Sequence, residues 1–180
     1  MSETVLKVNT FPAKVLRKKA KLVKQVTDYH RDLLSKMART MYGASGVGLA
    51  APQVGITEAL IVVDIGSGLY KLVNPRVVKK SGQQVNQEGC LSLPGVCLKV
   101  KRAKLVTVNG LDESGRPVTI DTQGLLACVL QHEIDHLKGK LIVDYASFIE
   151  RIKISKRIKE VKKKTQTEER EPVQLCQLEL

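Results

Sequence analysis

The stretch QHEIDHLKG (131–139) contains the side chains best suited to chemistry. On a helix, His132 and His136 project from one face about one turn apart, so both imidazoles can bind one metal ion. Glu133 lies one residue further round the helix, where its carboxylate can take a proton from a metal-activated water without binding the metal. The pattern therefore predicts a metal site that carries out hydrolysis.

Ordinary packing is the alternative explanation for these residues. A single histidine on a core helix is commonly a hydrogen-bonded packing residue, but two of the three histidines of the chain fall within five positions here. The surrounding helix is mostly apolar, so burying four polar groups in it costs free energy unless a partner satisfies them. A metal ion satisfies most of them, and we expect one.

The pentad supplies two ligands, whereas a catalytic site of this type needs a third protein ligand and an open position. No histidine follows His136, and Ile142 occupies the place of the third histidine in the H-E-x-x-H-x-x-G-x-x-H protease pattern. The protease interpretation is weakened by this. Cys90 lies in the glycine- and proline-containing stretch QEGCLSLPG (87–95), which favours an exposed thiolate, although packing explains Cys90 equally well when it is considered alone.

A helix over residues 122–139 has to position the pentad. Its apolar residues lie almost all the way round, which is typical of a helix in the middle of a core. Thr122 is the predicted N-cap and Gly139 the predicted C′ residue. A further helix is predicted over 28–42, with Thr27 as its cap.

Short β-rich runs separated by turn residues predict antiparallel strands. These runs are 59–65, 69–75, 103–111 and 116–121, after a glycine-spaced loop at 43–55. A third helix is predicted from about residue 145. The predicted fold class is α+β, with short antiparallel β-sheets packed around a central helix that carries HEIDH, plus a C-terminal helix.

Composition indicates one domain with an aliphatic core, since 180 residues contain 43% apolar but only 3% aromatic residues. The polar start MSETVLKVNT predicts no secretory signal, and the apolar runs are too short to cross a bilayer. We therefore expect a cytoplasmic protein without membrane contact. In that compartment the four cysteines are expected to be reduced thiols.

Three motifs in this order resemble those of the peptide deformylase family: GVGLAAPQVG (46–55), EGCLSLPG (88–95) and QHEIDHLKG (131–139). Further similarity covers most of residues 10–150. The resemblance implies a hydrolase that removes the formyl group from the N-terminal formylmethionine of newly synthesised proteins and releases formate. It also implies one divalent metal ion, Fe(II) in the cell, with Zn, Ni or Co able to occupy the site. The sequence itself does not identify the ion, because a thiolate with two imidazoles binds all of these.

The resemblance assigns roles to individual residues of the motifs. The metal ligands are implied to be Cys90, His132 and His136, so the third ligand lies upstream of the pentad. Glu133 is implied to be the acid/base that takes a proton from water and returns it to the departing amine.

The other two motifs are implied to bind the substrate. The side-chain amide of Gln53 and the backbone N–H of Leu91 would stabilise the oxyanion. Val47, Gly48 and Gly89 would pair with the substrate backbone as an added strand, although the glycines also suit ordinary turns.

Helix geometry adds an inference beyond the motifs. Leu125, Cys128 and Val129 lie seven, four and three residues before His132, so they share its face. Beside a metal they would form an apolar wall suited to a methionine side chain, and core packing is the alternative. Asp135 is expected to orient one of the histidines.

Some positions depart from the family pattern. FPAKVLRKKA (11–20) lacks the acidic residue often found after the proline, and Ser45 and Cys97 stand where charged or bulkier residues are common. These departures affect contacts at the rim of the site and not its chemistry.

The basic residues are unevenly distributed. Residues 151–164 hold eight basic residues and one acidic residue, which is +7 of the net charge of +12. Such a segment favours polyanions and suggests contact with the ribosome, or it is simply a solvated helix face. We expect a catalytic deformylase domain over 1–150 and a basic helix continuation with a flexible tail over 151–180. The expected partners are N-formylmethionyl nascent peptides, acted on by a monomer.

Two other functions remain open from the residues. One is a zinc peptidase that acts on unblocked peptides through the same metal site. The other is a non-catalytic protein with a structural Cys-His-His site and a basic helix that docks on RNA. Glu133 and Gln53 argue against the second, since a structural site needs neither.

Overall fold

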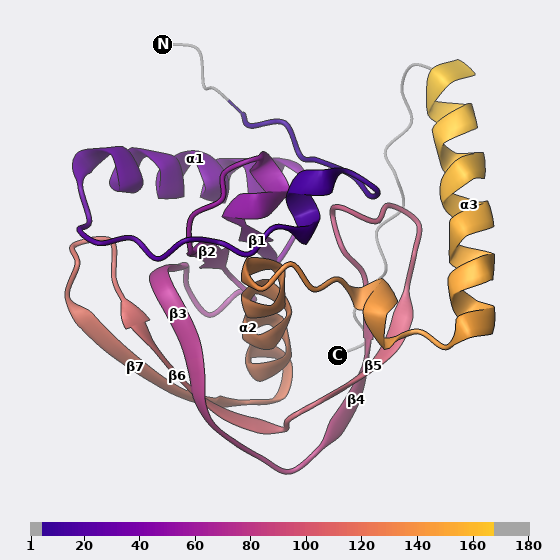
Figure 1. The fold of residues 1–180 in the computed structure, drawn as a ribbon. Coiled ribbons are helices and arrows are strands. Elements are labelled where there is room, and N and C mark those ends of the chain that lie inside the picture. The colour runs from indigo at the N-terminus through magenta and orange to yellow at the C-terminus, as the bar shows by residue number, and fades with distance from the viewer. Residues whose placement is uncertain (1–4, 168–180) are drawn as a thin grey trace.

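The helix that carries the pentad, α2 (Gly124–Leu137), lies in the middle of the molecule (Figure 1). The computed structural model describes residues 5–167. Within them, α2 lies between a five-stranded antiparallel sheet and a separate two-stranded sheet. The predicted α+β fold with a central helix is confirmed.

The five-stranded sheet has the strand order β1-β2-β3-β6-β7, and β4 pairs with β5 in the two-stranded sheet. β1 and β7 are therefore the edge strands of the larger sheet. The strands are β1 (Gly48–Ala50), β2 (Leu60–Val63), β3 (Tyr70–Ser81), β4 (Gln84–Glu88), β5 (Leu98–Arg102), β6 (Leu105–Leu111) and β7 (Pro117–Gln123).

The larger sheet is covered by helices on both faces, which explains the continuous apolar run in β2. Leu60 and Val62 pack in one cluster with α1 (Asp28–Gly43), while Ile61 and Val63 pack in another with α2. All four side chains have a relative exposure of 0%. A strand buried on both faces needs no polar alternation, because successive side chains enter different cores.

A third cluster joins the smaller sheet to the C-terminal part of the chain. It contains Leu98 and Val100 of β5, the 3-10 turn η3 (Ile142–Tyr145) and Ile154 of α3 (Phe148–Thr167). The basic segment 151–164 thus lies within a helix, while residues 168–180 of the expected tail lie outside the described residues.

Three strands were not predicted. β1 lies within the expected loop at 43–55 and is followed by the 3-10 turn η2 (Ala51–Val54). β4 has Val85 as its one apolar residue, and β5 has three basic residues among its five. These segments become strands by pairing with β2 and with each other, and local composition does not reveal that pairing. A further 3-10 turn, η1 (Lys14–Arg17), lies near the start of the chain.

Two local predictions were wrong. Thr122 is not the N-cap of α2, because strand β7 continues through it to Gln123; Gln123 occupies the N-cap position without a side-chain capping bond. Cys97 is disulfide-bonded, whereas Cys90 and Cys128 are buried free thiols. Cys97 is exposed, and Cys176 lies outside the described residues.

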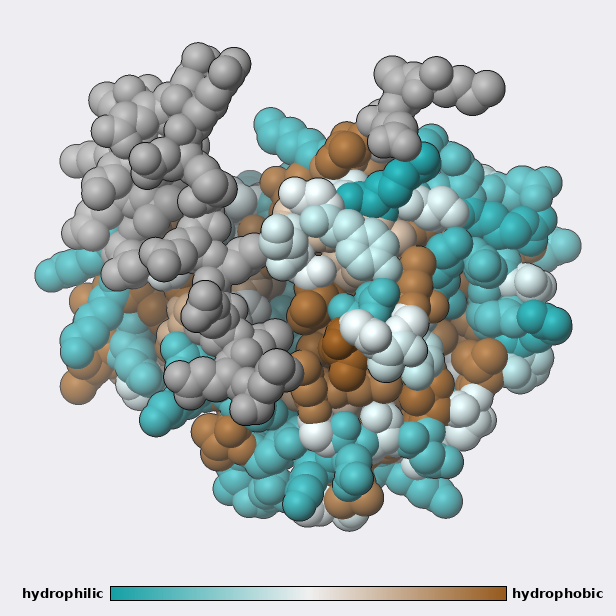
Figure 2. Space-filling view, turned by 180° about the vertical axis from the view of Figure 1, so that it is seen from behind, coloured by the Kyte–Doolittle hydropathy of each residue, from teal (hydrophilic) through white to brown (hydrophobic). Residues whose placement is uncertain are grey.

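The surface opposite to the view of Figure 1 is hydrophilic around its periphery, with apolar residues gathered toward the centre (Figure 2). Within residues 5–167, none of the helices combines the length and the apolar character that crossing a bilayer requires.

Gly139 ends α2 as predicted, with φ of +72°, and it provides a test of this packing. A Cβ at this position would lie 2.5 Å from the backbone oxygen of Arg17, whereas a Cβ on Gly124, with φ of +65°, meets nothing within 4 Å. Gly124→Ala should cost only the left-handed backbone strain, about 1–2 kcal/mol. Gly139→Ala should cost about 1–3 kcal/mol more, because the backbone of Arg17 has to move. Urea unfolding of both variants measures the difference, and equal losses would show that the contact with Arg17 is unimportant.

Candidate active site

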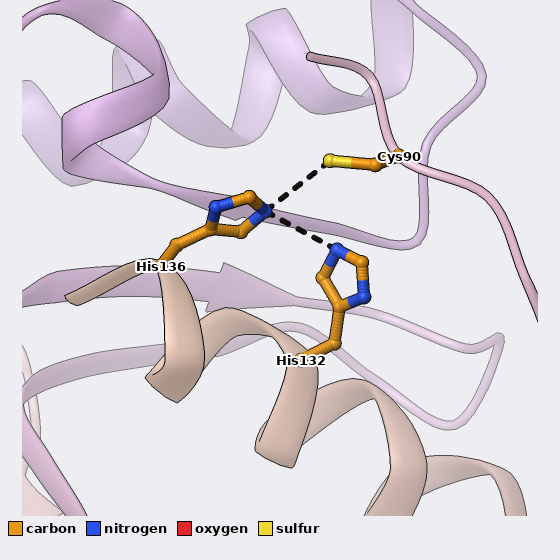
Figure 3. Close-up of side chains that lie close together, drawn as sticks. All are labelled: Cys90, His132 and His136. Atoms are coloured by element: carbon orange, nitrogen blue, oxygen red, sulfur yellow. Dashed lines mark hydrogen bonds between the residues drawn. The ribbon is translucent and has the colours of Figure 1, made fainter. Parts of the chain in front are cut away.

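Three potential metal ligands converge beside α2. His132 and His136 come from successive turns of the helix, and Cys90 comes from the loop after β4 (Figure 3). His136 Nε2 lies 3.2 Å from Cys90 Sγ and 3.2 Å from His132 Nε2, and the donor atoms of all three lie within 4.8 Å of one another. Two nitrogen ligands on one tetrahedral ion at 2.0–2.1 Å stand about 3.3 Å apart, so these positions fit a shared ion.

Cys90 is buried, with a relative exposure of 7%, and the prediction of an exposed thiolate is wrong in that respect. The loop after β4 turns inward, with Leu93 N–H bonded to the Cys90 carbonyl over 2.8 Å. The sulfur packs in the same cluster as Leu93 and Val96. Its setting is apolar except on the side of the histidines and Gln53.

Glu88 fixes the orientation of His132. The Nδ1–H of His132 donates to Glu88 Oε2 over 2.8 Å, and Arg102 donates from Nε and Nη2 to the two carboxylate oxygens over 2.7 and 2.9 Å. Burial alone would raise the pKa of Glu88, but these hydrogen bonds and charges lower it to about 2. The ionised carboxylate of Glu88 keeps the proton of His132 on Nδ1. The lone pair of His132 Nε2 is therefore directed toward the metal-binding atoms of Cys90 and His136.

Asp135 does not orient a histidine as expected. It pairs with Arg102 Nη1 and accepts a hydrogen bond from Tyr145 Oη over 2.6 Å. Arg102 is itself buried, with a relative exposure of 5%, and Nη1 also donates to Tyr145 Oη over 3.0 Å. Asp135 therefore binds the guanidinium nitrogen that Glu88 leaves free and helps to hold Arg102 against Glu88.

Glu133 is buried beside β1, with a relative exposure of 3%. Burial, the largest effect, raises the pKa of its carboxyl group to about 7. Its Oε2 atom has no hydrogen-bond partner among the described residues, so it is free to meet a substrate or a water. A buried carboxylate of this pKa suits a general base at neutral pH.

Gly48 makes room for that carboxylate. A Cβ at position 48 would lie 2.3 Å from Glu133 Oε1 and 2.8 Å from Cδ. Only glycine lets the backbone of β1 lie directly against the carboxyl group.

Gln53 approaches the ligands from η2. Its side chain is 1% exposed; Oε1 accepts a hydrogen bond from the backbone N–H of Ala50 over 2.8 Å, and Nε2 lies 3.6 Å from Cys90 Sγ. Among residues 5–167, no group accepts a hydrogen bond from the N–H of Leu91. Gln53 and Leu91, the two predicted oxyanion donors, line the same pocket as Cys90.

A pocket of about 100 Å³ lies next to these groups. Such a volume is below the 300–1,000 Å³ of pockets for drug-sized ligands, so it suits one side chain. Every predicted site residue except His136 lines it: Val47, Gly48, Gln53, Gly89, Cys90, Leu91, Leu125, Cys128, Val129, His132 and Glu133.

The thiol of Cys128 is a neutral part of this wall. It donates to Glu88 Oε1 over 3.1 Å, and burial, together with the nearby carboxylate, raises its pKa to about 12. The thiol therefore stays protonated and behaves as a small apolar group.

Sequence reasoning missed Glu88 and Arg102 as parts of the site. Glu88 opens the quoted motif EGCLSLPG, so its position was a signal that could have been used. Arg102 gives no such signal, because it lies opposite Gln84 in the β4–β5 ladder and only its long side chain reaches Glu88.

The chain matches known proteins over most of its length. The family described as Polypeptide deformylase matches residues 5–152. A peptide deformylase of Syntrophomonas wolfei is 50% identical over 143 residues, which are 79% of this chain and 94% of that protein. A peptide deformylase of Carboxydothermus hydrogenoformans is 49% identical over 147 residues, 82% of this chain and 97% of that protein.

Solved structures agree with these relatives. The crystal structure of a peptide deformylase from Legionella pneumophila has a TM-score of 0.89 and 41% sequence identity, covering 92% of this chain and all of that one. A peptide deformylase from Synechococcus elongatus, solved in complex with actinonin, has a TM-score of 0.81 and 40% identity, covering 89% of both chains.

Replacing Gly48 tests the placement of Glu133. Gly48→Ala should displace the carboxylate of Glu133 by about 1 Å and lower hydrolytic turnover about 10²-fold, because catalytic groups tolerate little misplacement. The control is Gly43→Ala, where an added Cβ meets nothing within 4 Å. A crystal structure of Gly48→Ala with Glu133 unmoved, or unchanged turnover, would contradict this account.

Replacing Arg102 tests the buried ion network. Arg102→Met leaves Glu88 and Asp135 without their partner and should lower the free energy of unfolding by about 3–5 kcal/mol. The matched control is Arg116→Met, since the exposed Arg116 pairs with Asp112 over 2.9 Å at the surface. Its loss should stay within about 1 kcal/mol in the same denaturation experiment. Similar losses in both variants would show that burial of the network adds nothing.

Proposed function

The chain belongs to the polypeptide deformylase family of hydrolases, and from this membership we propose how it acts. It removes the formyl group from the N-terminal formylmethionine of nascent peptides and releases formate. One observation supports the proposal: three potential metal ligands, a buried carboxylate and the Gln53 amide gather beside a pocket whose size suits one side chain.

Cys90, His132 and His136 would hold one divalent ion. The fit rests on the distances between their donor atoms. It also rests on the bond from His132 Nδ1 to Glu88, which leaves the lone pair on Nε2 free to bind an ion. When bound, such an ion acts as a Lewis acid and makes water more acidic. A thiolate and two imidazoles suit Fe(II) as well as Zn, Ni or Co, and we propose Fe(II) as the ion used in the cell.

The substrate would lie as an extended strand between two sheet edges. β1 is an edge strand, and β4 pairs only with β5 in the described part of the chain. Val47 and Gly48 on one side and Gly89 on the other line the same pocket, so their backbone groups can pair with the peptide. The methionine side chain would then lie against Leu125, Cys128 and Val129.

The remaining residues move the proton and stabilise charge. Glu133 takes a proton from the attacking water, and its pKa near 7 lets it pass that proton to the departing amine. The Gln53 amide and the Leu91 N–H donate to the formyl oxygen as negative charge develops on it. Each such donor contributes about 3 kcal/mol to the lowering of the barrier.

The basic helix α3 suggests that the enzyme works beside the ribosome, where nascent chains emerge. Arg151, Lys153 and Lys156 are exposed on it. Contact with the ribosome, the monomeric state and the division of the chain at residue 150 remain predictions.

Glu133→Gln provides the central experiment. Formate release from a formyl-Met peptide should fall about 10²–10⁴-fold, because the acid/base is removed. The metal-to-protein ratio should stay unchanged, because all three ligands remain. Glu113→Gln, at a partly exposed carboxylate that pairs with Lys71, is the control and should keep full activity.

Three results would contradict the proposal. The first is near-normal turnover by Glu133→Gln. The second is equal rates of the wild-type protein on formylated and acetylated peptides. The third is cleavage of unblocked peptides without release of formate, which would favour a zinc peptidase instead.

A further inference from the structure

The buried hydroxyl of Ser92 lies against Gln53 and has no part in the reaction as described so far. Gln53 Nε2 donates to Ser92 Oγ over 3.2 Å, and Ser92 has a relative exposure of 0%. A primary amide has two N–H groups. One of them is held by Ser92, and the other is directed at Cys90 Sγ, 3.6 Å away beside the histidines.

The opposite end of the amide is held as well. Gln53 Oε1 accepts the N–H of Ala50 over 2.8 Å, while Nε2 lies 3.6 Å from Cys90 Sγ, on the side of the metal donors. The terminal torsion of a glutamine is otherwise broad. Bonds at both ends fix the plane of the amide and direct the second N–H toward the reacting centre.

The N-terminal segment holds the backbones of the two residues independently of this bond. Asn9 donates from its backbone N and from Nδ2 to the Gln53 carbonyl over 2.7 and 3.1 Å. Phe11 N–H donates to the Ser92 carbonyl over 2.9 Å. Asn9 and Phe11 are two residues apart, so one short segment sets the spacing of both loops. Loss of the Ser92 hydroxyl should therefore release the amide without moving either backbone.

We propose that Ser92 is a positioning residue whose hydroxyl aligns the Gln53 amide for the oxyanion. Ser92 acts through Gln53 and binds neither the substrate nor the metal. The inference rests on the proposed function, because the oxyanion is the one formed when the formyl group is attacked.

A double-mutant cycle on formyl-Met peptide hydrolysis tests the role. Ser92→Ala should lower kcat about tenfold, as expected for the loss of one buried hydrogen bond, and leave KM nearly unchanged. Gln53→Ala alone should lower kcat about 10²–10³-fold. Adding Ser92→Ala to Gln53→Ala should change kcat by less than about twofold, because Ser92 then has nothing to align.

The orientation of the amide can be observed directly. In the ¹⁵N-labelled, zinc-loaded protein, the side-chain amide signal of Gln53 is identified by its absence in Gln53→Ala. Its protons should exchange with solvent faster in Ser92→Ala than in the wild type, with an unchanged metal-to-protein ratio. Ser35→Ala is the matched control, since the Ser35 hydroxyl donates to the Arg31 carbonyl on α1; it should alter neither kcat nor this signal.

The outcomes separate the two claims. If the wild-type protein releases no formate, the proposed function fails and the positioning role fails with it. If formate is released but the losses from the two substitutions multiply, or kcat of Ser92→Ala is unchanged, only the positioning role is wrong. Should Ser92→Ala not fold, Ser92→Cys keeps the shape, offers a weaker acceptor, and must show the same non-additivity with a smaller loss.

Discussion

The carboxylate of Glu88 is the contact on which the arrangement of the site depends. It lies in an aliphatic interior, where an ionised group is stable only if its oxygens are bonded. Arg102 occupies both oxygens from one side, and the remaining capacity of Oε2 accepts the N–H of His132. The orientation of the His132 ring is thus set by how a buried charge is satisfied on the neighbouring β4–β5 pair.

The central helix makes this arrangement possible because it is enclosed on every side. One face of the five-stranded sheet covers it, and the loop after β4 reaches it from the other side. Its buried polar residues have little access to water and depend on partners in the protein. His132 meets Glu88, and Asp135 meets Arg102 and Tyr145. Among the described residues of this helix, Glu133 Oε2 and His136 Nδ1 are buried without a partner. Glu133, the carboxylate of these two groups, is the one to which we assign proton transfer.

The sequence predicted the chemistry of the site better than its surroundings. Spacing on a helix was enough to place His132, Glu133 and His136 together, because the geometry of a helix is local. It also placed Leu125, Cys128 and Val129 in the same pocket. The role expected for Asp135 was wrong, since its partner Arg102 comes from β5, a strand that composition did not reveal. Cys90 was expected to be exposed, and the inward turn of its loop depends on packing against residues of η3 and α3.

By itself, the sequence determined the types and order of the reacting groups: the pentad, Cys90, Gln53 and the apolar stripe on α2. It also determined the helices and most strands, because the spacing of apolar residues along each segment is a local property of the sequence. Only the tertiary structure decided that Glu88 orients His132, that Gly48 leaves room for Glu133, and that Ser92 holds Gln53. These contacts join residues 39 to 85 positions apart, and such pairs meet only after the sheets have closed around the helix. No local pattern encodes them, since each depends on which surfaces pack and not on which residues are neighbours in the chain.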